Sequence, residues 1–303
     1  MKIIDAHAHI AKPIAGYCRR GELRAIGGGK ARWANGDVMK LIPDGYGDMD
    51  FTAESALRMM DENHVEKTVL VQGSMYGFQN EYTAEAVAKY PNRFTGACTV
   101  DPFAKNCMET LNRLTEELHF HSIKFEASSG GGLMGFHNDF ALDGPEMTKI
   151  YDVIAKKSMT LVLDIGDHTM ESYQPMAVAN IAKRYPGLRI VVCHLLAPLP
   201  KCELVLEQGL KKLKYDNVWF DTAALPNIAA PEVYPYPTSL NAIRMAKEIV
   251  GAKHLMWGTD MPMTVTMDSY RHLMDYISTQ NIFTDSELED FYYNNAQEVY
   301  FNF

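Results

Sequence analysis

Short apolar runs alternate with longer amphipathic stretches along the whole chain. The apolar runs are rich in β-branched residues and have the length of buried strands, whereas the stretches between them repeat apolar residues with the helical period. The predicted strands are residues 2–7, 67–72, 94–100, 121–126, 159–165, 188–194, 217–222 and 254–259. Helical patterns occupy residues 51–64, 81–91, 107–118, 145–157, 175–186 and 239–251.

Continuous apolar strands that are each followed by a helix indicate a parallel sheet covered by helices. About eight such units predict a closed (β/α)8 TIM barrel, which commonly needs about 250 residues. The 303 residues therefore suffice for one domain that spans residues 1–303. A doubly wound open sheet is the alternative, but the first strand lacks the G-x-G-x-x-G turn of the dinucleotide-binding version.

Residues 11–50 interrupt this alternation, because they show no clear hydrophobic period. We expect an irregular excursion after the first strand, on the face of the barrel where loops build active sites. The alternative is a surface excursion without chemistry. The GGGK stretch inside it lacks the spacing of a phosphate-binding loop.

Composition narrows the class of protein. Hydrophobic residues make up 47% of the chain and charged residues 22%, which is typical of a globular protein with a sizeable core. The net charge of -9, with acidic and basic residues interspersed, argues against a nucleic-acid partner. No apolar run is long enough for a membrane span, and the first residues lack the layout of a signal peptide, so we expect a cytoplasmic protein. The five cysteines form no Cys-x-x-Cys pair and are expected to be mostly small buried residues.

Polar side chains stand at the ends of several predicted strands, which is where such barrels place their catalytic groups. His7 and His9 end the first strand and point to the same face, because strand side chains alternate. His194 ends the sixth strand and Asp260 follows the eighth. Each of them alone could be a satisfied core residue or a helix cap, but a buried polar group needs a partner, and together these residues indicate a metal site.

These motifs resemble one family. DAHAH (5–9), RIVVCHL around His194 and WGTDMP around Asp260 are similar to the amidohydrolase superfamily, in its branch of metal-dependent hydrolases and decarboxylases called amidohydrolase 2. The likeness also includes residues 86–102, 121–130, 217–224 and 293–301, and so covers nearly the whole chain.

The resemblance implies a (β/α)8 barrel with one divalent metal ion, zinc or manganese. It implies that His7, His9 and Asp260 are ligands, and that His194, with Asp260, acts in proton transfer. The family also places a ligand histidine at the end of strand five, and there this sequence departs from the pattern, because Asp164 occupies the position and His168 follows four residues later.

Three outcomes are open at strand five. Asp164 binds the metal, His168 reaches in from the loop as a substitute, or the metal site is weakened or lost. We favour Asp164, because a second carboxylate brings a divalent site with two neutral imidazoles from about +1 to about neutral, which suits oxygen-loving ions such as manganese.

Other strand ends and the excursion supply weaker candidates for substrate binding. Lys124 could meet a substrate carboxylate, although its ammonium could equally reach solvent. Asp221 fits a hydrogen bond to a catalytic histidine or to substrate, and Arg19 and Arg20 could clamp a carboxylate, although paired basic residues are more often solvated.

The expected reaction is hydrolysis of a C–O or C–N bond in a small, carboxylate-bearing substrate, with water activated by the metal and its proton taken by Asp260 or His194. The first alternative is a metal-dependent, non-oxidative decarboxylase (carboxy-lyase) of an aromatic or unsaturated acid. The second is a barrel that binds a ligand without turnover. A homodimer is expected from the resemblance alone.

Overall fold

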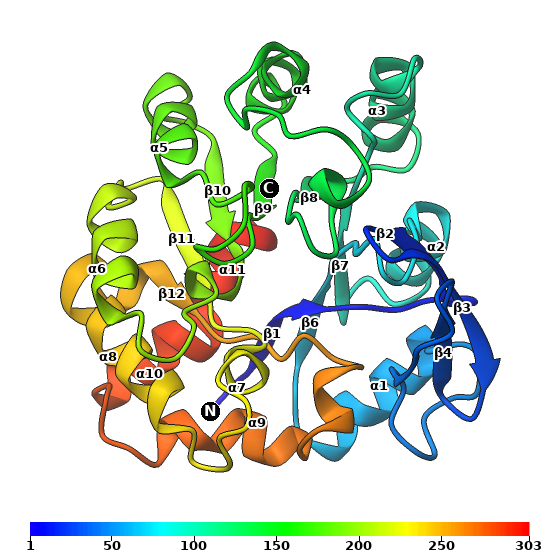
Figure 1. Ribbon diagram of the computed structural model, residues 1–303. Helices are drawn as coiled ribbons and strands as arrows, with labels where there is room; N and C mark the ends of the chain where they lie inside the picture. The colour runs from blue at the N-terminus through cyan, green and yellow to red at the C-terminus, as the bar shows by residue number, and fades with distance from the viewer. Residues whose placement is uncertain (303) are drawn as a thin grey trace.

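The computed structural model describes residues 1–302 and confirms the predicted barrel (Figure 1). Eight parallel strands follow one another around the sheet in chain order, and each corresponds to one of the eight predicted strands. They are β1 (Ile4–Ala8), β6 (Lys67–Leu70), β7 (Phe94–Cys98), β8 (Ser122–Glu126), β9 (Thr160–Asp164), β10 (Arg189–Val192), β11 (Val218–Asp221) and β12 (Leu255–Met256).

The barrel closes between its last strand and its first. Ala8 pairs with Met261 in a parallel bridge, and the amides of His9 and Asp260 donate to the carbonyls of Met261 and His7 at 2.8 Å each. The buried Asp5 carboxylate reinforces this seam, because it accepts hydrogen bonds from the Thr259 amide at 2.9 Å and from the Thr259 hydroxyl. The first and the last strand of the barrel therefore meet beside the DAHAH motif.

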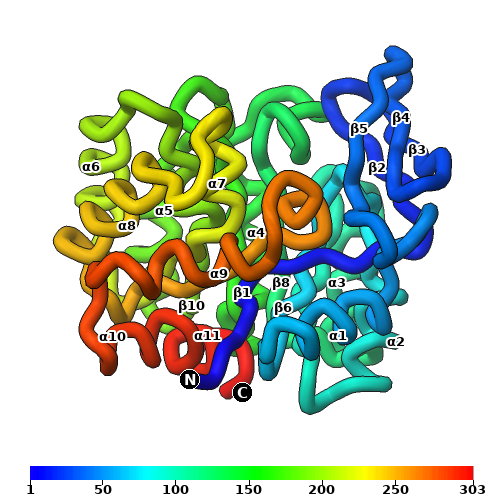
Figure 2. The backbone as a smooth tube through the Cα atoms, turned by 90° about the horizontal axis from the view of Figure 1, so that it is seen from below, coloured from blue at the N-terminus to red at the C-terminus, as the bar shows by residue number. Residues whose placement is uncertain are grey.

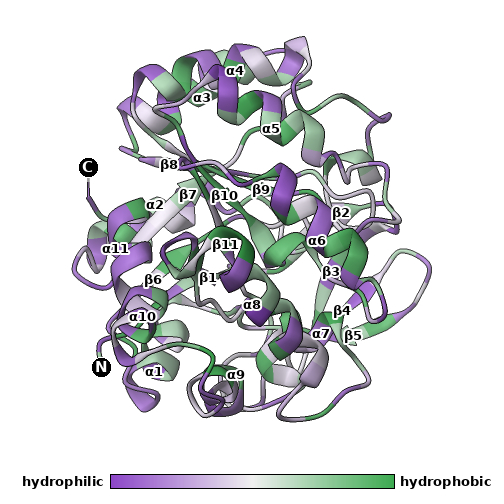
Figure 3. Ribbon diagram, turned by 90° about the vertical axis from the view of Figure 1, so that its left-hand side faces the viewer, coloured by the Kyte–Doolittle hydropathy of each residue, from purple (hydrophilic) through white to green (hydrophobic). Residues whose placement is uncertain are grey.

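Helices surround the barrel, and their apolar residues recur at helical spacing, so each can bury one face. Figure 3 shows hydrophobic and hydrophilic residues alternating around the outer helices α3 and α4. The helices are α1 (Ala53–Glu62), α2 (Asn80–Lys89), α3 (Cys107–Glu116), α4 (Pro145–Lys156), α5 (Pro175–Arg184), α6 (Glu203–Lys212), α7 (Leu225–Ile228), α8 (Pro237–Val250), α9 (Tyr270–Ser278), α10 (Asp285–Glu289) and α11 (Asn295–Tyr300). No helix among residues 1–302 is both long and apolar enough to cross a membrane.

Helix α11 closes one end of the barrel. Its residues Ala296, Val299 and Tyr300 are buried in one cluster with Ile4 and Val191 of the strands. Figure 2 shows both chain termini at this end and the segment 15–40 at the other end. Access to the strand tips is therefore from the opposite end, where the strands finish.

The expectation of an irregular excursion at residues 11–50 is wrong in its local structure. This segment forms a four-stranded antiparallel sheet, ordered β2-β3-β4-β5. Burial alternates along its short strands, but glycine, alanine and cysteine supply part of the buried face, so the hydrophobic pattern is weak. The strands are β2 (Ala15–Cys18), β3 (Gly21–Gly27), β4 (Lys30–Trp33) and β5 (Val38–Lys40).

This sheet docks on the loop that follows β6. The amides of Ala15 and Tyr17 donate to the carbonyls of Tyr76 and Ser74, at 3.2 and 3.0 Å. Gly16 makes the approach possible, since a Cβ there would lie 2.1 Å from the Met75 carbonyl oxygen. The excursion thus supports the loop that follows β6, while its part in the active site stays a prediction.

Candidate active site

The strand tips bring together the residues that the sequence singled out on four strands. His7 lies in β1 and His9 directly follows it, His194 follows β10, Asp221 ends β11 and Asp260 follows β12. The imidazole centroid of His7 lies 5.3 Å from that of His9 and 4.8 Å from that of His194. His7 and Asp221 are fully buried, while the Asp260 and His194 side chains are 14% and 13% exposed, so the site opens toward these two.

The contacts of His9 fix its tautomer. Its Nδ1 lies 2.9 Å from the carbonyl oxygen of Val71, which can only accept, so Nδ1 carries the proton. Burial lowers the pKa of His9 to about 4, despite the opposing influence of Asp260. Its Nε2 therefore presents a lone pair, and this atom lies 2.9 Å from Oδ1 of Asp260.

His7 is held in the same way by Asp221. Nδ1 of His7 lies 3.0 Å from Oδ2 of Asp221 and donates to it. Burial would raise the pKa of Asp221, but the hydrogen bond that His7 donates and the neighbouring His194 hold it well below its usual range, so the carboxylate is an acceptor. Nε2 of His7 thus also presents a lone pair, 3.7 Å from Asp260 Oδ1.

Three acceptor atoms consequently converge on one place. The ligand atoms of His7, His9 and Asp260 lie within 4.8 Å of one another. Burial would raise the pKa of Asp260, but its close contact with His9 and the nearby His7 and His194 lower the pKa to about 2, so this carboxylate is ionised. Two imidazole lone pairs facing a carboxylate repel one another unless a cation lies between them, and a divalent metal ion fits this set of donors.

A second group of atoms at this spacing has weaker metal-binding chemistry. It contains His7, Cys193 and His194. Burial raises the pKa of the Cys193 thiol well above its usual range, and Asp221 adds to the shift. A protonated thiol is a poor ligand, so the group of His7, His9 and Asp260 is the better candidate.

His194 stands on a strained turn. Four successive residues, His194, Leu195, Leu196 and Ala197, have left-handed backbones with φ between 46° and 64°. Such conformations cost of order 1–3 kcal/mol each for residues other than glycine and are concentrated at functional sites. The His194 amide donates to Asp221 Oδ1 at 2.9 Å, which helps to hold the turn.

The turn aims the reactive nitrogen of His194 at the mouth. Nδ1 donates to the Ala223 carbonyl at 3.0 Å, which leaves Nε2 to exchange a proton. Burial would lower the pKa of His194, but the charges of Asp164, Asp221 and Asp260 raise it. His194 thus has the tautomer and the surroundings of a general acid or base.

Asp164 ends β9, the fifth strand of the barrel, and its side chain reaches the site but faces His194. Its Oδ2 lies 3.7 Å from His194 Nε2, and its Oδ1 accepts from the Gly166 amide at 2.9 Å. Asp164 is not a member of the group of His7, His9 and Asp260, so its role as a ligand stays a prediction. His168 lies beside Cys202, with 3.5 Å between Nε2 and Sγ.

The three predicted basic residues lie in different surroundings, because one is buried in the site and two are exposed. The Lys124 ammonium is buried and lies 3.1 Å from Nε2 of His7, so it uses the same lone pair that a metal ion would use. Arg20 is exposed, pairs with Asp37 at 3.1 Å and lies over the ring of Trp33. Arg19 is also exposed, with its backbone against Gly135.

Glu126 is a site residue that sequence reasoning missed. It lies two residues after Lys124 on β8, so both side chains share one face of the strand, and it is paired in register with Asp164. Its Oε2 accepts from the Ser74 amide at 2.6 Å. Burial raises the pKa of Glu126 to about 7, with Lys124 opposing and Asp164 adding to the shift. Strand alternation from Lys124 was the signal that could have found it.

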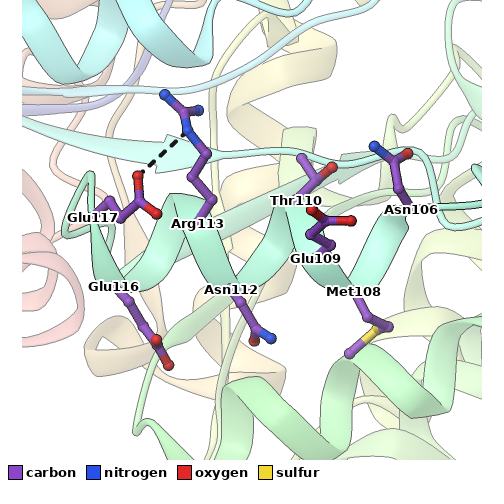
Figure 4. A pocket seen from close by; sticks show the side chains of 8 residues that line it. All are labelled: Asn106, Met108, Glu109, Thr110, Asn112, Arg113, Glu116 and Glu117. Carbon is purple, nitrogen blue, oxygen red and sulfur yellow. Dashed lines mark ion pairs between the residues drawn. The ribbon is translucent and has the colours of Figure 1, made fainter.

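A separate surface depression lies elsewhere. It measures about 630 Å³ and is lined by residues 106–117 on and beside α3, where Arg113 pairs with Glu117 (Figure 4). Its side chains are mostly polar and come from the outer face of one helix. It lacks the convergent donors of the strand tips, which therefore remain the candidate active site.

Comparisons with known proteins agree with this fold. The model of the amidohydrolase family matches residues 4–301. The fold is a (β/α)8 barrel with histidine and aspartate donors at its strand tips. The chain belongs to the amidohydrolase family.

Three solved structures have a similar fold. A probable 2-pyrone-4,6-dicarboxylic acid hydrolase from Acinetobacter baumannii is 20% identical, with 99% of each chain covered and a TM-score of 0.68. An amidohydrolase from Burkholderia multivorans, solved with bound zinc, is 13% identical, with 99% of each chain covered and a TM-score of 0.70. The 5-carboxyvanillate decarboxylase from Sphingomonas paucimobilis is 16% identical over 82% of each chain, with a TM-score of 0.58.

Asp221 is fully buried and orients His7 and the His194 turn without facing the mouth of the site. Asp221→Asn places an amide where His7 Nδ1 needs an acceptor, so we expect metal affinity to fall about 10- to 100-fold and stability to fall by about 1–3 kcal/mol. Metal titration and denaturant unfolding measure the two effects. The exposed Asp216→Asn is the matched control. Unchanged metal affinity in Asp221→Asn would show that His7 does not depend on this partner.

Proposed function

We propose that this amidohydrolase-family enzyme is a metal-dependent hydrolase that cleaves a C–O or C–N bond in a small, carboxylate-bearing substrate. One observation carries the proposal: with their Nδ1 protons donated to Val71 and Asp221, His9 and His7 both turn Nε2 toward the ionised Asp260. His7, His9 and Asp260 would hold one divalent ion, zinc or manganese, with Asp164 as the favoured further ligand. When bound, such an ion supplies Lewis-acid polarisation of a substrate carbonyl and acidifies water.

The chain's own residues supply the proton transfer. His194 takes a proton at Nε2 from the attacking water and returns it to the leaving oxygen or nitrogen. The Asp164 carboxylate, 3.7 Å from that nitrogen, stabilises the imidazolium that forms in between. Asp221 orients both His7 and the His194 turn through its two oxygens.

The proposal is tested with a panel of esters, lactones, amides and hydroxybenzoates, scored for acid production and for carbon dioxide release. Acid production that is lost with a chelator and restored by added zinc or manganese supports metal-dependent hydrolysis. Decarboxylation of a hydroxybenzoate would instead favour the second candidate, a carboxy-lyase. That candidate is retained because one of the similar structures is a decarboxylase and the Lys124 ammonium could hold a carboxylate in the same site.

Lys124 is the substrate-binding residue with the clearest test. Among the described residues it is the only lysine or arginine that is buried, so it is the chain's own cation for a substrate carboxylate. Lys124→Met keeps most of the stem and removes the charge, so we expect KM for a carboxylate-bearing substrate to rise about 10- to 100-fold.

The metal content of Lys124→Met shows whether Lys124 acts on the substrate or on the metal site. Because the ammonium repels a cation at His7 Nε2, Lys124→Met should retain its metal or bind it more tightly. An uncharged ester of similar shape serves as the control and should lose little. Loss of metal in Lys124→Met, measured by elemental analysis, would assign Lys124 to the metal site and remove it from substrate binding.

A further inference from the structure

Tyr76 forms part of the wall beside His9. It stands in the loop between β6 and α2, and its ring lies 4.6 Å from the His9 imidazole at an interplanar angle of 31°. The side chain is 3% exposed. Gly73 allows this packing, because a Cβ there would lie 3.1 Å from His9 Cε1 and 3.3 Å from Tyr76 Cδ2.

The hydroxyl of Tyr76 has no acceptor for its proton in the described part of the chain. The Met263 backbone amide lies near the phenol oxygen but makes no hydrogen bond of normal geometry with it, so the hydroxyl has neither a donor nor an acceptor among the described residues. The ring that carries this hydroxyl packs on His9, whose Nε2 faces Asp260, so the phenol stands beside the strand tips. A buried O–H without an acceptor costs free energy, and such groups in native proteins call for an explanation.

The fold does not need this hydroxyl to position the ring. The Tyr76 amide donates to the Gly73 carbonyl at 3.1 Å, and its carbonyl accepts from the Ala15 amide of β2 at 3.2 Å. Glu126 holds the same loop through the Ser74 amide. Contacts from the two sheets therefore fix the loop, and none of them uses the phenol proton.

We propose that Tyr76 is a substrate-binding residue whose hydroxyl donates a hydrogen bond to a carbonyl or carboxylate oxygen of the substrate, bound beside His9 and Asp260. The inference rests on the proposed function, because it assigns the missing acceptor to the substrate of that site. A substrate oxygen that gains negative charge during the reaction strengthens this hydrogen bond.

The test compares Tyr76→Phe with Tyr151→Phe on the ester, lactone or amide that the wild-type enzyme cleaves fastest. Tyr151 in α4 is the matched control, because it is also fully buried and its hydroxyl also lacks a partner. We expect Tyr76→Phe to lower kcat/KM about 10- to 100-fold and Tyr151→Phe to leave it unchanged. Neither variant should lose thermal stability or metal, since neither breaks a hydrogen bond within the chain.

Two results would overturn the inference. The first is a kcat/KM of Tyr76→Phe within about twofold of the wild-type value. The second is a melting temperature of Tyr76→Phe several degrees below that of Tyr151→Phe, which would reveal an internal partner of the hydroxyl. If the wild-type protein cleaves nothing on the panel, the proposed function fails, and the melting comparison still decides whether the Tyr76 hydroxyl lacks a partner inside the chain.

Discussion

Replacement of Asp260 by asparagine is expected to lower kcat/KM by at least about 1000-fold and to release the bound metal. The reason is the charge of the site: Asp260 is the ionised member of the group of His7, His9 and Asp260, and its Oδ1 lies 2.9 Å from His9 Nε2. An amide of the same shape removes that charge. Elemental analysis and steady-state kinetics on the same preparation measure both effects.

The exposed Asp139→Asn is the control for Asp260→Asn, because it makes the same chemical change away from the site. It should retain full activity and metal. If Asp260→Asn also retained both, the group of His7, His9 and Asp260 would not be the metal site.

The second large effect is expected at His194. His194→Asn removes the nitrogen that exchanges the proton, so we expect kcat to fall about 100- to 10,000-fold while the metal stays bound. Asparagine tolerates the left-handed backbone of this position, so the turn should persist. His119→Asn is the matched control, because His119 is exposed and has a similar φ of 55°.

The His194 variant also separates an enzyme from a barrel that binds a ligand without turnover. Measured kcat, metal content and ligand affinity are needed together. A variant that kept its kcat would remove His194 from the proton transfer, and one that lost its metal would place His194 among the ligands.

The barrel could be predicted from the sequence because its eight strands are buried on both faces and read as continuous apolar runs. The sheet at residues 15–40 could not, because its strands are short and glycine and alanine supply part of its buried face. Helix α6 gave a weaker signal than its neighbours, since Gly209 lies inside it against Leu196 and Tyr173.

The site residues likewise divide into those that the sequence pattern predicts and those that it does not. Residues at strand tips, such as His7 and Asp221, converge because a barrel brings the carboxyl ends of its strands to one face. Loop residues depend on contacts far apart in the sequence. The orientation of Asp164 toward His194 and the packing of Tyr76 on His9 arise from such contacts, so no local pattern could reveal them.

The central claim is that His7, His9 and Asp260 hold one divalent ion that turnover requires. Elemental analysis of the purified enzyme, before and after treatment with a chelator and alongside the activity of each sample, tests it most directly. We predict about one zinc or manganese ion per chain, lost together with activity and restored with it. A protein that contains no divalent metal and whose activity is unaffected by chelators would contradict the claim.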